Sequence, residues 1–232
     1  MPYRLTERGE RRREAMRSRI ALTAAALFAQ NGYHATTLRE VVEAANTSIG
    51  NLYFYFANKE ALLAEVVELE SAEVGAVVDR AIESVPPGPE SLAIAVYVAV
   101  QHSLASPAAW RFIKILKEAP EARPLVLAHF VERTFRVFEA RPELCAGRPD
   151  LAAHAWQGAI FDVLESVVTG RLSASPQDVG CFLAGWNLRA LNLPDEAIGA
   201  AMARLKRYIE EQQSPNKDQR TNRRRQRDHA PR

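Results

Sequence analysis

The sequence predicts an all-α protein. Apolar residues recur three and four positions apart through most of the 232 residues, which is the spacing of one face of an α-helix. Stretches with the alternating pattern of a half-buried strand are scarce. Most of the expected helices also begin or end at a proline, which fits the first turn of a helix and prevents its continuation. We therefore expect helices throughout and no sheet.

The first expected helix ends near Asn31, where the following Gly32 suits the left-handed conformation that often terminates a helix. Thr37 then begins a second helix, because Glu40 stands three positions later and each side chain can accept a hydrogen bond from the other residue's backbone amide. The apolar faces of these two helices are formed by Ile20, Ala24, Leu27 and Phe28 in the first and by Leu38, Val41, Val42 and Ala45 in the second.

A tight turn that begins at Asn46 separates the second helix from a short third one. Asparagine tolerates the left-handed backbone that such a turn requires, and Ser48 is a favourable N-cap for a helix from about residue 49 to residue 56. Leu52 and Phe56 are four positions apart and are expected to face inward. Two helices joined by a turn of this kind form a helix-turn-helix.

The rest of the chain is expected to form a longer series of helices. Asn58 can cap a fourth helix from Lys59 to about Ser84, and the prolines within residues 86–89 mark the clearest boundary. Further helices are expected over residues 90–105, 107–117, 123–140, 150–169, 176–191 and 194–213. The predicted division of the chain is an N-terminal arm with the helix-turn-helix (residues 1–57), a larger helical domain (residues 58–213) and a basic, disordered tail (residues 214–232).

Charge is distributed unevenly along the chain, although the formal net charge is only +2. Residues 1–59 carry a net charge of +4 and residues 214–232 carry +5, whereas the segment between them carries −7. Basic ends of this kind favour contact with a polyanion. Two interpretations stay open for the arginines of residues 4–19 and of residues 223–227: each group is either a solvated part of the surface or an arm that adds affinity for DNA.

The composition argues against several other classes of protein. The longest wholly apolar run covers residues 92–100, about half of the ~20 residues that a membrane-spanning helix needs. The charged N-terminus lacks the apolar stretch of a signal peptide, and Cys145 and Cys181 do not have metal-ligand spacing. No phosphate-binding glycine loop, HExxH zinc motif or GxSxG nucleophile elbow occurs. We therefore expect a cytoplasmic, non-enzymatic protein with no membrane segment, catalytic residue, metal or cofactor.

The expected outward face of the third helix suits a nucleic acid. Four residues remain for its outer or rim positions: Ile49, Asn51, Tyr53 and Tyr55. Tyrosine hydroxyls can donate to phosphate oxygens while the rings pack on the domain, and Gly50 lets another surface approach the backbone. Thr37 and Ser48 stand at helix N-termini, where exposed amides and the helix dipole favour a phosphate.

One stretch of the chain resembles the signature of the tetracycline-repressor (TetR) family of bacterial transcriptional regulators: ATTLREVVEAANTSIGNLYFYFANKEALL. The paired threonines, the aromatic segment after Leu52 and the Asn-Lys-Glu start of the next helix occur together within residues 17–63. In that family a three-helix DNA-binding domain precedes a helical domain that dimerises and binds a small molecule. The resemblance implies the same fold class here, an all-α chain with an N-terminal helix-turn-helix DNA-binding domain and a larger helical ligand-binding and dimerisation domain.

The resemblance also implies roles for individual residues. The DNA-binding set is expected to comprise Thr36, Thr37, Arg39, Thr47, Ser48, Ile49, Gly50, Asn51, Tyr53, Tyr55 and Lys59. Within this set Arg39, Ile49 and Asn51 would lie nearest the base edges, and most of the others would approach the phosphate backbone. Two positions depart from the family's pattern. Asn46 stands where the turn usually has glycine, and Ile49, which can meet a thymine methyl group but cannot hydrogen-bond a base, stands where relatives often have a polar residue.

The larger domain offers aromatic residues that either line a ligand pocket or form its core. The candidate ligand-binding residues are Tyr97, His102, Trp110, Phe112, Trp156 and Phe161. His102 follows Ala95 and Ala99 on one helix face, from which it would orient a ligand. The candidate dimer-interface residues are Gly158, Phe182, Gly185 and Trp186, because the last long helices before the C-terminal one dimerise in the resembled family and glycines allow close helix packing.

These observations together predict a homodimeric, ligand-responsive regulator that binds double-stranded DNA. We expect a repressor that leaves a palindromic operator when a small, largely apolar effector binds among the later helices. The alternative is a helical small-molecule-binding protein whose N-terminal module makes protein contacts instead of DNA contacts. The basic N-terminus argues against this alternative.

Overall fold

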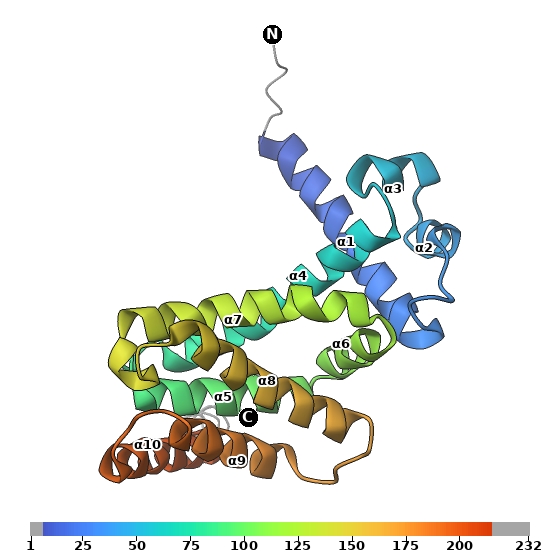
Figure 1. The fold of residues 1–232 in the computed structure, drawn as a ribbon. Coiled ribbons are helices and arrows are strands. Elements are labelled where there is room, and N and C mark those ends of the chain that lie inside the picture. The colour runs from blue at the N-terminus through green and yellow to red at the C-terminus, as the bar shows by residue number, and fades with distance from the viewer. Residues whose placement is uncertain (1–6, 215–232) are drawn as a thin grey trace, which may run out of the picture.

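The computed structural model describes residues 7–214, and this range contains ten α-helices, two short 3-10 helices and no strand (Figure 1). The α-helices are α1 (Glu7–Asn31), α2 (Leu38–Ala44), α3 (Ile49–Tyr55), α4 (Lys59–Ile82), α5 (Pro89–Ala105), α6 (Pro107–Glu118), α7 (Arg123–Ala140), α8 (Pro149–Val168), α9 (Pro176–Arg189) and α10 (Asp195–Gln213). The all-α fold class is confirmed. The sequence did not predict the 3-10 helices η1 (Pro120–Ala122) and η2 (Pro142–Cys145). The expected tail lies, apart from its first residue, outside the described range, and so does Arg4.

Local hydrogen bonds begin and end the first three helices where the sequence predicted. Gly32 adopts a left-handed backbone after α1, with a φ of 91°. Thr37 and Glu40 form the expected capping box at the start of α2, in which Glu40 Oε2 accepts from the Thr37 amide at 2.7 Å. Asn46 is left-handed, with a φ of 48°, and the Ser48 side chain caps α3. The chain therefore reverses between α2 and α3 as a helix-turn-helix requires.

The first three helices close over a core that also includes parts of α4 and α6. Phe28, Leu52 and Phe56 are almost completely buried in it, and Phe112 and Ile115 of α6 pack into the same cluster. α1 rests on both α4 and α6. The helix-turn-helix is thus packed against the larger domain and is not an isolated unit.

The larger core is built around α5, which contacts α4, α6, α8, α9 and α10. The apolar run of residues 92–100 lies within this helix, and most of its side chains are buried, as expected for a helix that is apolar on every side. Gly180 lets α9 approach α5 closely, since a Cβ atom at this position would lie 2.9 Å from Cδ2 of Tyr97. No helix in residues 7–214 is long and apolar enough to cross a bilayer.

α4 connects the two cores along its length (Figure 1). Its beginning belongs to the first core through Leu62 and Val66, and its end packs on the second through Val78. Arg17 Nε of α1 donates to Glu65 Oε1 of α4 at 2.8 Å, which ties the two helices at the upper end. A movement of α4 would therefore displace the helix-turn-helix relative to the larger domain.

Candidate nucleic-acid interface and ligand cavity

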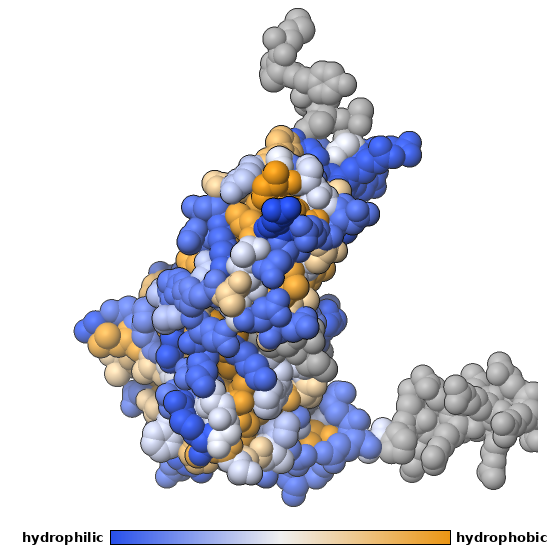
Figure 2. Space-filling view, turned by 90° about the vertical axis from the view of Figure 1, so that its right-hand side faces the viewer, coloured by the Kyte–Doolittle hydropathy of each residue, from blue (hydrophilic) through white to orange (hydrophobic). Residues whose placement is uncertain are grey.

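α3 has a buried side and a solvent-facing side. Leu52 and Phe56 are 0% and 2% exposed and face the first core, as predicted, whereas Ile49 and Tyr53 are 46% and 53% exposed. Tyr55 is partly buried and packs against the same core. Figure 2 faces the side of the molecule on which α2 and α3 lie, and hydrophobic residues stand there among hydrophilic ones at the upper end. α3 is thus anchored in the first core by its buried side and presents a mixed apolar and polar surface to solvent.

The beginning of α3 is ordered by its own side chains. Ser48 Oγ accepts from the Asn51 amide at 3.1 Å, and Asn51 Nδ2 donates to Thr47 Oγ1 at 2.7 Å. Gly50 faces open space, because a Cβ atom there would have no other side chain or distant backbone within 4 Å. The side-chain amide of Asn51 is therefore held in one orientation. At the neighbouring Gly50 another molecule can approach the backbone itself.

Phe54, which was not among the predicted contact residues, extends the exposed surface. Its side chain is 61% exposed and its ring meets the edge of Tyr55 with ring centroids 5.0 Å apart. The guanidinium carbon of Arg13 in α1 lies 4.8 Å from the Phe54 ring centroid. A contact of this kind is worth about 0.5–1 kcal/mol at an exposed site. It places the arginine-rich first turns of α1 next to α3.

Thr36 is a correction to the expected DNA-binding set. Its side chain is 1% exposed, and its hydroxyl lies 2.8 Å from the Gly32 carbonyl oxygen and 3.3 Å from that of Leu27. It therefore closes the turn after α1 and cannot contact a phosphate. Thr37 is exposed, but its hydroxyl donates to Glu40 Oε2 at 2.8 Å, and its amide and hydroxyl together lower the pKa of Glu40.

The two basic residues of the expected set already have partners within the chain. Lys59 Nζ donates to the His34 carbonyl oxygen at 3.3 Å and lies 4.5 Å from the Tyr33 ring centroid. These contacts offset the unfavourable position of a cation at a helix N-terminus, and burial lowers the pKa of the Lys59 ammonium. Arg39 points into solvent and pairs with Glu43 at 3.3 Å. Phosphate or base contacts by either residue stay predictions.

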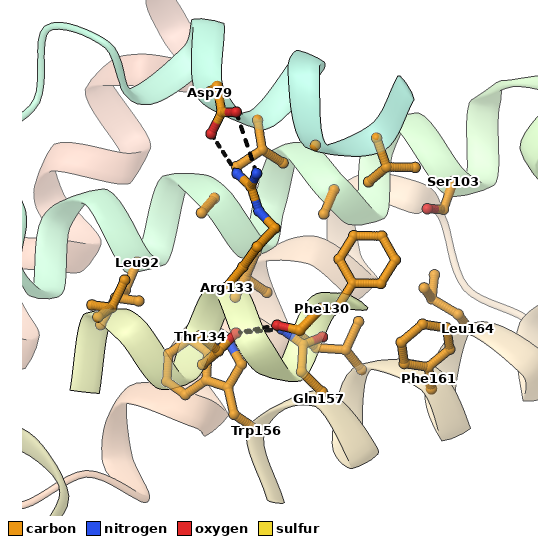
Figure 3. Close-up of a pocket in the computed structure, with 18 of the residues that line it drawn as sticks. Asp79, Leu92, Ser103, Phe130, Arg133, Thr134, Trp156, Gln157, Phe161 and Leu164 are labelled. Carbon is orange, nitrogen blue, oxygen red and sulfur yellow. Dashed lines mark hydrogen bonds and ion pairs between the residues drawn. The ribbon is translucent and has the colours of Figure 1, made fainter. Parts of the chain in front are cut away.

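A cavity of about 370 Å³ lies between α4, α5, α6, α7 and α8 (Figure 3). Three of the six candidate ligand residues line it: Phe112, Trp156 and Phe161. Most of the other lining side chains are aliphatic or aromatic, Phe130 and Leu164 among them. The volume lies within the range of sites for small organic molecules.

The other three candidates for ligand binding do not reach the cavity. Tyr97 packs against Tyr208 and Gly180 on the far side of α5, His102 lies 3.6 Å from Glu73, and Trp110 Nε1 donates to the Leu104 carbonyl oxygen at 2.9 Å. The reason is the helix face. α5 turns one face to the cavity, formed by Leu92 and Val96 together with four residues that recur at every fourth position, Ser91, Ala95, Ala99 and Ser103. His102 is one position away, which turns it by about 100° around the helix.

Two pairs of polar side chains in the cavity wall link neighbouring helices, and the sequence did not predict either pair. Arg133 of α7 reaches over Gly75 and forms an ion pair with both carboxylate oxygens of Asp79 on α4. Below it, Gln157 of α8 donates to Thr134 Oγ1 at 2.7 Å (Figure 3). Both pairs join α7 to a neighbouring helix across the cavity. Within residues 7–214 no group of three or more His, Cys, Asp or Glu side chains is placed to hold a metal ion.

Comparisons with known proteins agree with this architecture. Residues 20–66 match the family model of bacterial regulatory proteins of the tetR family. The probable acrEF/envCD operon repressor of Escherichia coli is 28% identical over 183 residues, which cover 75% of this chain and 81% of that repressor. The crystal structure of RolR in complex with resorcinol aligns with a TM-score of 0.63 and 24% identity over 83% of this chain and 95% of RolR.

The chain belongs to the TetR family.

A second relative matches a shorter stretch of this TetR protein. The transcriptional regulator QacR of Staphylococcus aureus is 40% identical over 58 residues, which cover 25% of this chain and 31% of QacR. The match with QacR is thus stronger in identity than the match with the Escherichia coli repressor, but it spans less than a third of QacR. Family membership favours a DNA-binding regulator over the alternative of a helical protein whose N-terminal module makes protein contacts. TetR proteins are regulators and not enzymes.

The four candidate dimer residues of this TetR chain lie in different surroundings. Phe182 and Trp186 of α9 are 61% and 56% exposed, and their rings stack with centroids 6.1 Å apart. Gly158 of α8 faces open space, so it leaves room for an approaching helix. Gly185 is buried, and a Cβ atom there would lie 3.6 Å from Cε of Met202 in α10. Its neighbours here belong to the same chain, and its place in a dimer interface stays a prediction.

Replacing Thr36 by valine tests the structural role assigned to this residue. We expect the free energy of unfolding to fall by about 1 kcal/mol, because a buried hydroxyl loses its hydrogen bond to a helix carbonyl. The affinity of the folded protein for DNA should stay unchanged. Urea denaturation measures the first quantity and a gel shift the second. Weaker DNA binding with unchanged stability would restore the phosphate contact that the sequence predicted.

Proposed function

We propose that this TetR protein is a homodimeric repressor that leaves its operator when a small, largely apolar molecule binds in the cavity. The observation that carries the proposal is the exposed face of α3, with Ile49, Tyr53 and Phe54 beside the arginine-rich first turns of α1. Three large side chains of mainly apolar character that lie exposed on one helix indicate a surface that contacts a partner. The neighbouring arginines suit a polyanion as that partner. A protein with this function works in the cytoplasm, where its operator lies.

The two α3 helices of the dimer would enter successive major grooves of a palindromic site, about one helical turn apart. Ile49 would meet a thymine methyl group, and Asn51, whose side-chain N–H is bonded to Thr47, would offer its free Oδ1 to a base donor. Tyr53 and Ser48 would contact phosphates. Arg13, held by Phe54, would add a phosphate contact from α1.

Dimerisation would use the exposed surfaces of α8 and α9. Phe182 and Trp186 offer a stacked aromatic pair, and Gly158 offers space for a helix of the second copy. Symmetric dimers pair the same surface of both subunits, so the aromatic pairs of both copies would lie within one interface. Burial of these rings would supply much of the association energy.

The effector would act by changing the position of α4 and α6. Phe112 of α6 lines the cavity and also packs in the core of the helix-turn-helix, so a ligand that displaces it also shifts the support of α1. The ligand need only bind the released conformation more tightly than the DNA-bound one, and couplings of about 1–3 kcal/mol are typical. RolR was solved with the small aromatic ligand resorcinol, which supports an effector of similar size here.

Titration of the protein onto the DNA upstream of its own gene, at several salt concentrations, tests the proposal. We expect tight binding that weakens steeply as salt rises, because the protein would displace counterions from several phosphates. Random DNA of the same length and composition is the control. Binding that is absent, or that does not respond to salt, would contradict a DNA-binding role.

Two substitutions in α3 separate phosphate contacts from base contacts. Tyr53→Phe should weaken binding to operator and random DNA by a similar factor, since it removes one hydroxyl that meets the backbone. Asn51→Ala should lower the preference for the operator, since a good base contact is worth about 1–3 kcal/mol of discrimination. Competition gel shifts measure both. Equal effects of Asn51→Ala on the two duplexes would refute this division of roles.

A further inference from the structure

The charged side chains that line the cavity are all engaged with partners. Asp79 is paired with Arg133, and Arg136 is paired with Glu132 at 3.0 Å. Glu70 also takes part in an interaction of its own. An ionic ligand would therefore meet charges that a partner already neutralises, whereas a neutral ligand would leave these interactions intact.

The hydrogen-bond directions of the Thr134–Gln157 pair follow from a chain of constraints. The Phe130 carbonyl oxygen can only accept, so the Thr134 hydroxyl, 3.0 Å away, must donate its single proton there. The Thr134 oxygen is then an acceptor toward Gln157, which must present its NH₂ group at 2.7 Å. This assignment leaves Gln157 Oε1 as a hydrogen-bond acceptor without a partner among the described residues. Gln157 lines the cavity (Figure 3).

Resting on the proposed function, we propose that the effector is an uncharged molecule with an aromatic or aliphatic body and one hydrogen-bond donor, which Gln157 Oε1 accepts. The body would pack among Phe130, Trp156 and Phe161, which stand around the Thr134–Gln157 pair (Figure 3). A phenol, an alcohol or an amide N–H supplies the required donor. Thr134 is a positioning residue, because it holds the Gln157 amide in the orientation that presents oxygen to the ligand.

The same geometry disfavours ionic ligands. A carboxylate has no proton to donate and would be repelled by Gln157 Oε1, and the Arg133 charge that could attract it is already paired with Asp79. An ammonium group carries donors, but transfer of a charge into an apolar cavity is costly when no free carboxylate awaits it. The donor and the absence of charge are therefore both needed.

Isothermal titration calorimetry of the full-length protein without DNA tests the proposal with five probes that share one body. The probes are 4-propylphenol, 4-propylanisole, 4-propyltoluene, 4-propylbenzoate and 4-propylbenzylammonium. We expect the phenol to bind about tenfold more tightly than the toluene, which has the same size without polarity, and than the anisole, which keeps the oxygen but has no donor. Both ions should bind more weakly than the phenol.

Other rankings overturn the proposal. Tightest binding of the benzoate would make Arg133 the anchor, and tightest binding of the ammonium would make an acidic residue the anchor. Equal affinity of all five probes, or no binding by any, would show that the Gln157 oxygen does not select the ligand. None of these results bears on DNA binding, which the salt titration tests separately.

Two variants locate the preference in the cavity. Gln157→Leu should reduce the phenol to the affinity of the toluene, a loss of about tenfold. Thr134→Val should lower the ratio of phenol to anisole affinity, because the Gln157 amide is then free to turn and present N–H instead. Gln30→Leu is the matched control, because it replaces the same type of residue at an exposed position of α1, and it should leave all affinities unchanged. An unchanged phenol preference in Gln157→Leu would refute the assignment even if the wild-type ranking is as expected.

Discussion

Replacement of both Phe182 and Trp186 by glutamate is expected to convert the proposed dimer into a monomer and to weaken operator binding by about a hundredfold or more. The two rings are 61% and 56% exposed and stacked, so the monomer loses little packing when they are removed. In a symmetric interface the introduced carboxylates of both copies would lie within one contact surface, where they would be desolvated and would repel each other. Each half-site would then be bound separately, without the gain in affinity that linkage provides.

Sedimentation equilibrium gives the oligomeric state of this variant, and a gel shift gives its affinity for the operator. Circular dichroism should show unchanged helix content, which separates loss of dimer from loss of fold. Leu125→Glu is a suitable control, because Leu125 is a similarly exposed apolar residue, 47% exposed, on α7. A double variant that remains a dimer would place the interface on another face of the molecule.

Truncation of Phe112 to alanine is expected to lower the free energy of unfolding by about 3–5 kcal/mol, as for other buried phenylalanines. The side chain is 6% exposed and belongs to the core of the helix-turn-helix while it also lines the cavity. The loss should therefore also reduce the response of DNA binding to the ligand. The structural reason is that, without the Phe112 ring, a ligand in the cavity would no longer push on the side chain by which α6 packs in the core of the helix-turn-helix.

Urea denaturation measures the stability of Phe112→Ala, and the release of operator DNA by 4-propylphenol measures the coupling. The milder Phe112→Leu should keep the protein folded if the alanine variant does not. Ile160→Val is the control, because Ile160 lines the cavity and packs only in the larger core. It should cost about 0.5–1.5 kcal/mol and leave the coupling intact. Full ligand-induced release in both Phe112 variants would show that the signal takes another route.

Helix boundaries were predictable here because the interactions that set them are local. The capping box joins Thr37 to Glu40, and Ser48 caps α3 through the amide of Asn51, three positions on in each case. The left-handed Asn46 needs only its own tolerance of that backbone. The same reasoning placed Leu52 and Phe56 on the buried side of α3, since four positions make one turn of helix.

Side chains in the candidate sites were less predictable. Thr36 and Thr37 are neighbours in the same motif, yet one is buried against helix carbonyls and the other is exposed at a cap. His102 and Ser103 are also neighbours, and only Ser103 lines the cavity. In each pair both residues have a polar side chain that could occupy either place, the buried or the exposed one in the first pair and the cavity wall or the outside in the second. The orientation of the helix in the packed molecule decides between them.

The amino-acid sequence alone determined the all-α class, the positions of the caps and the helix-turn-helix, because hydrogen bonds between residues three or four positions apart do not depend on the rest of the chain. Only the tertiary structure decided which groups meet across helices. Gln157 and Thr134 are 23 positions apart, Arg133 and Asp79 are 54 apart, and α6 enters the core of the DNA-binding helices from the middle of the chain. Such contacts arise from the way ten helices pack together, and no local pattern encodes them.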